Sequence, residues 1–183
     1  APVLGVLGER GACYRYGAPL DVRWMSGGWS SHLEFRGPIR VRTDFFTRLP
    51  RLDAITLARV WDEQRGRKLP FVDPPELARM KQTNREKDYV VIGELSRLME
   101  DPGDRLRYSR SAREIIRLAN AHPNDCARVA AERPLLAEAD RGEERIAQLL
   151  DEKRRELIRR NERRLQARLN ASREWIARWP SLA

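Results

Sequence analysis

The stretch from residue 143 to residue 179 contains neither proline nor glycine, and no other feature of the sequence constrains the fold as strongly. Apolar residues recur in it at spacings of three, four and seven, as they do on one face of an α-helix. We therefore predict one long helix from about Ala137 to Trp179. At 1.5 Å per residue it would span roughly 50 Å or more, which exceeds what a compact domain of this size needs. The apolar positions are Ile146, Leu149, Leu150, Leu157, Ile158, Leu165, Leu169, Ile176 and Trp179.

This predicted helix is strongly basic. Between Asp151 and Arg178, ten lysine or arginine residues stand against five aspartate or glutamate residues, so the segment carries +5 of the net charge of +9. A chain with this excess attracts acidic partners such as nucleic acid, nucleotides or an acidic protein. Three interpretations stay open: a solvated face on a helix that packs across its own domain, an arm that forms a homodimer, or a contact to nucleic acid.

The N-terminal part predicts an antiparallel sheet. Residues 12–16, 20–25, 31–36 and 39–46 are short segments rich in aromatic and β-branched residues, separated by glycine- and proline-containing turns. Four strands joined by tight connections indicate a meander. Residues two apart share a face of a strand. One face is therefore expected to bury apolar residues such as Leu33, Phe35, Ile39, Val41, Thr43 and Phe45, and the other collects Asp21, Arg23, His32, Glu34, Arg40, Arg42 and Asp44.

Two interpretations of that charged face remain open. A sheet with one face in water explains mixed charges without any function. Alternatively, Asp21, Glu34 and Asp44 form a set of carboxylates that holds a divalent cation such as Mg²⁺, with Arg42 placed to bind phosphate oxygens. Carboxylates on strands are the credible catalytic material, because a chain with only two histidines does not favour a histidine-based triad or metal site.

The middle of the chain predicts short helices with short connections. Asp73 is a candidate N-cap before Pro74 and Pro75, which are tolerated in a first helical turn. Residues 101–103, Asp-Pro-Gly, predict a turn. The expected helices cover residues 52–65, two segments within 74–99, residues 112–120 and residues 125–132.

Four charged residues lie at the junction of the two helices within residues 74–99. They form either a solvated cluster of salt bridges or a site that faces an anion. Composition alone does not separate these two interpretations. The four residues are Lys81, Arg85, Lys87 and Asp88.

Together these patterns predict an α+β protein. Its parts are an N-terminal antiparallel sheet with one helix (residues 1–72), a helical subdomain (73–136) and a long basic C-terminal helix (137–183). Cys13 and Cys126 are expected to be free thiols in a reducing cytoplasm. No apolar run approaches the roughly 20 residues that span a bilayer. Because the sequence begins with alanine, we expect a processed chain or part of a longer product.

Two stretches resemble the latter part of minimal nucleotidyltransferase-like proteins, including the toxins of abortive-infection systems. The first is Val41-Arg-Thr-Asp44-Phe-Phe. The second runs from Leu69-Pro-Phe-Val-Asp73-Pro-Pro-Glu-Leu77-Ala-Arg-Met-Lys81 to Arg85-Glu-Lys87-Asp88, and the resemblance covers about residues 39–99. It implies that Asp44 is the third carboxylate of a metal site. It also matches Lys81, Arg85, Lys87 and Asp88 to the family's charged helix corner. Combined with the sheet residues, it gives Asp44 and Glu34 as catalytic metal ligands and Asp88 as a structural ion-pair partner. The candidate substrate contacts are then Lys81, Arg85, Lys87 and, from the sheet, Arg42.

The family's characteristic Asp-x-Asp strand has no full counterpart upstream of Asp44. In Asp21-Val-Arg23, an arginine stands where the second carboxylate belongs. The leading hypothesis is therefore a nucleotidyltransferase-like protein that binds nucleotide or nucleic acid, with catalytic activity either kept or lost. The alternative hypothesis is a non-catalytic nucleic-acid or protein interaction module that uses the basic C-terminal helix.

Overall fold

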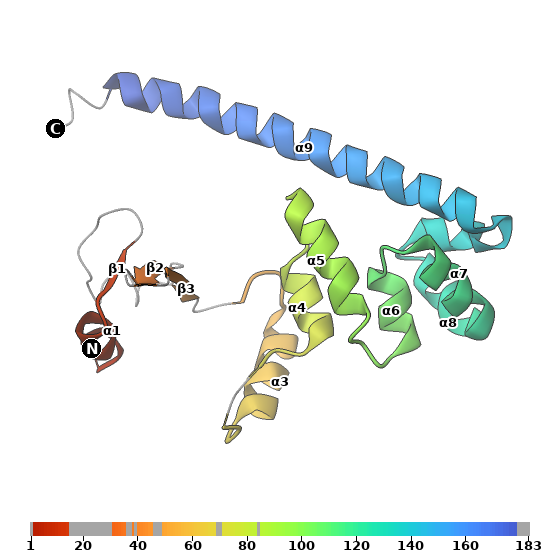
Figure 1. The fold of residues 1–183 in the computed structure, drawn as a ribbon, viewed down its shortest axis with the longest axis horizontal. Coiled ribbons are helices and arrows are strands. Elements are labelled where there is room, and N and C mark those ends of the chain that lie inside the picture. Colours follow the sequence, from red (N-terminus) through yellow and green to blue (C-terminus); the bar gives the residue numbers. More distant parts are fainter. Residues whose placement is uncertain are drawn as a thin grey trace. The chain divides into compact units, whose positions relative to one another are not determined.

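The computed structural model describes residues 2–14, 31–35, 38, 40–45, 49–68, 71–83 and 85–178, and it shows an α+β protein that is mostly helical (Figure 1). The chain divides into two compact units, residues 1–65 and residues 66–183. The first unit holds helix α1 (Pro2–Glu9), a small sheet and helix α3 (Ala54–Gln64). The second unit holds the remaining helices, and each unit is described separately below.

Within the described residues, the sheet of the first unit has three antiparallel strands in the order β1 (Ala12–Tyr14), β2 (Ser31–Phe35) and β3 (Val41–Phe45). The antiparallel sheet is therefore confirmed. The predicted meander is wrong at β1, because it placed residues 20–25 between two strands that pair directly with each other. Residues 20–25 themselves lie outside the described part of the chain.

The first of the two interpretations, a charged face in water opposite a buried apolar face, is wrong at Glu34. Leu33 and Glu34 are neighbours on β2, so their side chains point to opposite faces of the sheet. Both are buried, and Glu34 is only 2% exposed, whereas Val41 is 49% exposed. Burial in this sheet therefore does not follow the alternation of apolar and charged residues.

Helix α3 confirms the helix predicted over residues 52–65, with its start two residues and its end one residue inside the predicted bounds. The N-cap Asp53 accepts a hydrogen bond of 2.8 Å from the backbone N–H of Thr56, which satisfies one of the free donors of the first turn. Just beyond the helix, Gly66 has a φ of 79°, a conformation that glycine adopts without strain. Helix α1 has eight residues and lies directly before the sheet in the chain.

The second unit consists of short helices followed by one long one. One helix start that contains proline differs from the predictions. Asp101 caps a helix by accepting from the N–H of Asp104 at 2.7 Å, and Pro102 fills its first position, so the predicted turn is wrong. Pro134 begins a 3₁₀ helix. The elements are α4 (Pro74–Met80), α5 (Glu86–Ser96), α6 (Pro102–Tyr108), α7 (Ala112–Ala121), α8 (Pro123–Ala130), η1 (Pro134–Arg141) and α9 (Glu143–Arg178).

Two clusters of buried side chains form the core of this unit. The smaller cluster joins Ala78 of α4, Ile92 of α5, Met99 between α5 and α6, and Tyr108 of α6. The larger cluster joins α6, α7, α8, η1 and the first two turns of α9, so the start of the long helix is part of the core. Its members are Leu106, Ile115, Leu118, Ala119, Cys126, Val129, Leu135, Leu136, Ile146 and Leu150.

The long helix is confirmed, but it begins at Glu143 and not at Ala137. Gly142 has φ 90° and ψ 175°, which is incompatible with a continuous helix from η1 into α9. The first turns of α9 pack on the core, and the hydroxyl of Tyr89 donates to the carbonyl oxygen of Leu150 at 3.2 Å. Beyond α5 the helix continues on its own within this unit (Figure 1). Residues 162–171 are all exposed. Among the described helices, none has the length and apolar content needed to cross a membrane.

Candidate functional site

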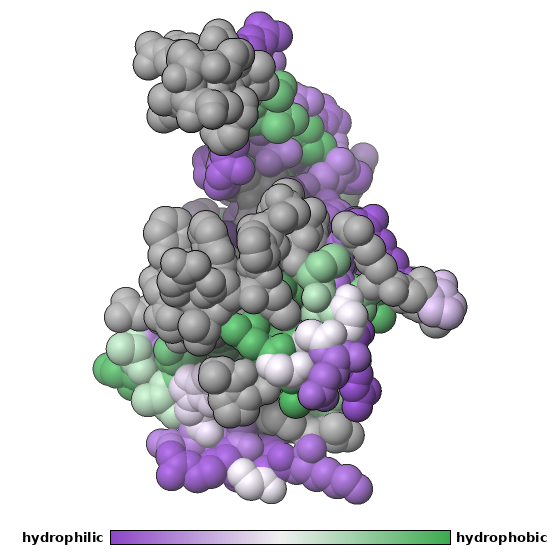
Figure 2. Space-filling view, turned by 90° about the vertical axis from the view of Figure 1, so that its left-hand side faces the viewer, coloured by the Kyte–Doolittle hydropathy of each residue, from purple (hydrophilic) through white to green (hydrophobic). Residues whose placement is uncertain are grey.

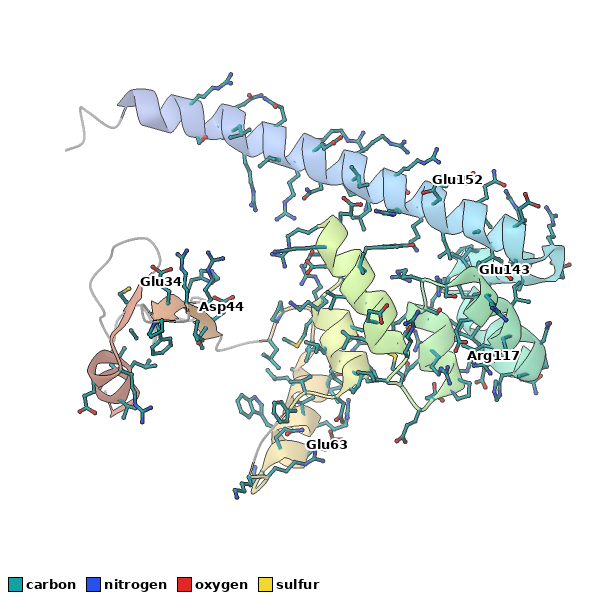
Figure 3. The ribbon with its side chains drawn as sticks, viewed as in Figure 1. Glu34, Asp44, Glu63, Arg117, Glu143 and Glu152 are labelled. Atoms are coloured by element: carbon teal, nitrogen blue, oxygen red, sulfur yellow. The ribbon has the colours of Figure 1, made fainter. Side chains whose placement is uncertain are left out.

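The predicted sheet site has its described members on one face. His32 is opposite Asp44 in the β2–β3 register, and Glu34 is opposite Arg42, so all four share a face. His32 Nδ1 lies 2.7 Å from Asp44 Oδ1. Arg40 donates through Nε to Glu34 Oε2 at 3.0 Å and also through Nη2. Figure 3 shows Glu34 and Asp44 on adjacent strands.

The side-chain partners of Glu34 and Asp44 bear on whether these carboxylates can bind a cation. Asp44 is paired with His32, and the buried Glu34 carboxylate is bound by the positive charge of Arg40. No group of three or more histidine, cysteine, aspartate or glutamate side chains in the described part of the chain is placed to hold a metal ion. Both described carboxylates of the predicted site therefore already have side-chain partners. Asp21, the third predicted ligand, lies outside the described residues, so the Mg²⁺ role stays a prediction.

The predicted charge cluster between α4 and α5 is built around Asp88. The Asp88 side chain is buried, and Arg85 Nε donates to its Oδ2 at 2.7 Å. The hydroxyl of Thr83 donates to the same oxygen and accepts from the N–H of Arg85 at 3.1 Å. Burial raises the pKa of Asp88. The hydrogen bonds from Thr83 and Arg85 and the charges of Arg85 and Lys81 lower the pKa by more than burial raises it, so the pKa lies below its ordinary value. The cluster fixes the start of α5.

The cations of this cluster differ in their availability to a ligand. Lys81 ends α4, and its charge acts on Asp88. Lys87 is exposed, and Arg85 remains 51% exposed while it pairs with Asp88. The predicted substrate residues thus fall into two groups, with Arg42 and Asp44 in the first unit and the α4–α5 cluster in the second.

Arg133 is a buried cation that sequence reasoning missed. It precedes η1, and its guanidinium donates to the carbonyl oxygens of Leu106 and of Ser109, the latter at 2.7 Å. In the described part of the chain no carboxylate pairs with it, and its Nε has no hydrogen-bond partner. Burial and the charge of Arg110 lower the pKa of Arg133 to about 9.

Arg110 is a second cation that pairs with no carboxylate among the described residues. Its guanidinium carbon lies 4.6 Å from the centre of the Tyr89 ring, a cation–π contact, and it donates to the carbonyl oxygen of Ser109 at 3.2 Å. Its Nε is buried without a hydrogen-bond partner in the described structure. Burial lowers the pKa of Arg110, and desolvation together with the charges of Arg133 and Arg110 lowers the pKa of Lys153. Positive charge is thus concentrated on one side of the core.

Arg110 borders a pocket of about 500 Å³ between α5, α6, α7 and α9. Six arginines but only two glutamates line it. Four separate segments supply these arginines, so no single stretch of the sequence contains the set, and Arg97 and Arg117 each have a glutamate three residues away, as on an ordinary solvated helix. The sequence therefore gave little sign of the site beyond Ser109-Arg110-Ser111 between two helices. The arginines are Arg97, Arg105, Arg110, Arg113, Arg117 and Arg154.

A further basic surface lies on the second half of α9, which we call the basic arm (residues 158–178). Figure 2 shows hydrophilic side chains along α9, at the top of the view, beside a smaller hydrophobic patch. Nearer the core, Arg155 pairs with Asp151, and Arg160 pairs with Glu156 at 2.7 Å. Other exposed arginines of the helix have no hydrogen bond or ion pair in the described part of the chain. These are Arg159, Arg163, Arg164, Arg168 and Arg173.

Neither the family models, nor the curated proteins, nor the solved structures with which the chain was compared gave a match.

Proposed function

We propose that this protein binds nucleic acid through the basic arm. The observation that carries the proposal is the set of five exposed arginines from Arg159 to Arg173, none of which meets a carboxylate in the described structure. An arginine that has no intramolecular partner can bind a phosphate without first losing an ion pair. Phosphate contacts of this kind supply most of the affinity in sequence-independent binding.

The arrangement of these arginines supports contact along a backbone. At 100° per residue, Arg159, Arg163 and Arg173 fall within about 80° of one another around the helix axis. Arg164 and Arg168 lie on a second side. A helix that presents two rows of guanidinium groups can contact phosphates on both sides of a groove. Because such contacts do not read bases, we expect little sequence preference.

The test is the affinity for a labelled 20-base-pair duplex, measured by fluorescence anisotropy at 50 and 200 mM salt. We expect affinity to fall steeply with salt, and to be lost when residues 158–183 are deleted. This deletion keeps Ile146 and Leu150 and so leaves the core contacts of α9 in place. Unchanged affinity in the shortened chain would refute the proposal, and circular dichroism checks that the shortened chain is folded.

A nucleotidyltransferase-like function is the second proposal. It is supported by the resemblance of residues 39–99 to that family and by the shared face of His32, Glu34, Arg42 and Asp44. Calorimetry with nucleoside triphosphates, with and without Mg²⁺, tests it. We expect heat of binding that is reduced in Asp44→Asn, and the absence of heat with every triphosphate would contradict it. A Lys81→Ala variant that loses stability but keeps ligand binding would assign Lys81 a structural role.

A homodimer through the same arm is a separate partner proposal. Leu165 is 55% exposed and Leu169 47% exposed, on the stripe that also contains Ile158. We expect the wild type to sediment as a dimer in analytical ultracentrifugation and Leu165→Glu to sediment as a monomer. The same mass for the wild type and the variant would contradict the dimer.

The free thiols of Cys13 and Cys126 support a cytoplasmic location, where thiols stay reduced.

A further inference from the structure

The pocket beside Arg110 has more positive charge than its own residues neutralise. Arg97 pairs with Glu94 at 3.2 Å, and Arg154 pairs with Glu86. Arg117 pairs with Glu114 at 2.9 Å, and Arg105 shares that same glutamate. These pairings use every glutamate that lines the pocket.

Two arginines of the pocket remain without a carboxylate in the described structure. Arg113 is exposed at the first turn of α7 and has no hydrogen bond or ion pair there. Arg110 is held deeper, between the Tyr89 ring and the carbonyl oxygen of Ser109, and its buried Nε has no partner. Behind it, Arg133 adds another charge that no carboxylate of the described chain balances. Burying unpaired charge is costly, so this arrangement favours an anion in the pocket.

The backbone is adapted to keep Arg110 in place. A Cβ atom built on Gly93 would lie 3.0 Å from both Cβ and Cγ of Arg110, so the glycine lets the arginine stem lie against α5. The α7 N-terminus borders the same pocket through Ser111 and Arg113. The partial positive charge of a helix N-terminus adds to the attraction for an anion.

We infer that this pocket binds a phosphorylated small molecule of about the size of a mononucleotide. A phosphomonoester is a dianion, which matches two unpaired guanidinium groups better than a single carboxylate does. The volume of about 500 Å³ lies within the range of small-molecule sites. Val90 and Gly93 supply an apolar wall for the organic part of the ligand. The inference is independent of the basic arm and of the sheet face.

The test uses the full chain at low ionic strength, with inorganic phosphate, pyrophosphate and adenosine monophosphate as probes in calorimetry and thermal denaturation. We expect binding and a raised Tm with at least one probe. Arg110→Met and Arg113→Gln should each weaken binding about tenfold or more, as expected for a lost charge-assisted bond. Arg128→Gln, which removes a surface arginine paired with Asp125 outside the pocket, should bind as the wild type does.

The relative affinities of the three probes show whether the pocket binds an organic phosphate or inorganic phosphate. Tighter binding of the mononucleotide identifies an organic phosphate as the ligand, and equal binding of all probes overturns the organic part of the proposal. No heat and no shift of Tm with any probe overturns the site. Binding that survives unchanged in Arg110→Met and Arg113→Gln overturns the site as well.

The Arg110→Met variant should remain folded, because the substitution removes a positive charge that repels the charge of Arg133. Replacement of Arg159 and Arg163 by glutamine should leave this binding unchanged.

Discussion

Gly93 and Arg110 are in direct contact: a Cβ added to the glycine would lie 3.0 Å from Cβ and from Cγ of the arginine. Glycine within a helix costs about 1 kcal/mol relative to alanine, so its position in the middle of α5 calls for an explanation. The close approach of Arg110, which Gly93 permits, provides one. The arginine in turn covers the ring of Tyr89.

Gly93→Ala should therefore fail to give the stability that alanine normally adds to a helix. We expect a loss of about 1 kcal/mol, because Arg110 must move away from Tyr89, together with weaker phosphate binding. Urea denaturation measures the first effect. Gly5→Ala in α1 is the control, since nothing lies within 4 Å of its added Cβ, and it should gain about 0.5–1 kcal/mol. An equal gain in both variants would show that Gly93 does not constrain Arg110.

Gly142→Ala should destabilise the second unit although it removes no contact. The residue has φ 90° and ψ 175°, a region that is essentially restricted to glycine, while its Cβ would have nothing within 4 Å. Strain of this kind costs about 1–3 kcal/mol. Thermal denaturation of the variant measures it. A variant as stable as the wild type would mean that the η1–α9 junction adopts another conformation.

Stability should depend on Asp88 in a pH-dependent way. Its pKa is lower in the folded protein than its ordinary value of 3.8, so its contribution is complete above about pH 5 and is lost as the pH falls through the folded pKa. We expect Asp88→Asn to cost about 1–3 kcal/mol at neutral pH. The difference from the wild type should shrink below pH 4 in urea denaturation.

Glu94→Gln is the matched control for Asp88→Asn. Glu94 lies on the same helix and also pairs with an arginine three positions away, but both members of this pair are exposed. An exposed pair contributes little, so we expect a change within about 0.5 kcal/mol. A cost equal to that of Asp88→Asn would show that burial of Asp88 is not what makes its ion pair important.

Paired and unpaired arginines of α9 should differ in their effect on nucleic-acid binding. Replacing Arg159 and Arg163 by glutamine removes two groups with no partner in the described structure. The slope of log K against log salt should then fall by about 2. Replacing Arg155 and Arg160, which pair with Asp151 and Glu156, should change the slope less. Equal effects would show that the ion pairs do not limit binding.

The sequence predicted the elements whose signals are local and uninterrupted. The absence of proline and glycine after Gly142 was enough to predict α9, and local apolar spacing was enough to predict a helix over residues 52–65, where the structure has α3. Helix α6 was missed because Asp101-Pro-Gly is also a common turn sequence. In the structure the same aspartate and proline act as an N-cap and a first helical residue.

Properties that depend on distant residues were not predictable in the same way. Alternation along β2 placed Glu34 on a charged face that was expected either to lie in water or to hold a cation, whereas Glu34 is buried with Arg40. The pocket beside Arg110 depends on which arginines find a carboxylate after four segments have packed together. No spacing within any one of those segments contains that information. The α4–α5 cluster could be predicted because its members are close in sequence. The burial of Asp88 could not be predicted, because it depends on how the helices pack.

The length of the basic arm determines how long a stretch of duplex it can contact. Twenty-one residues beyond the core contacts extend about 30 Å. Base pairs of a duplex are 3.4 Å apart, so the arm can follow about nine of them. Duplexes shorter than this should bind less tightly as they lose phosphates within reach, and longer ones should accept several copies of the protein side by side.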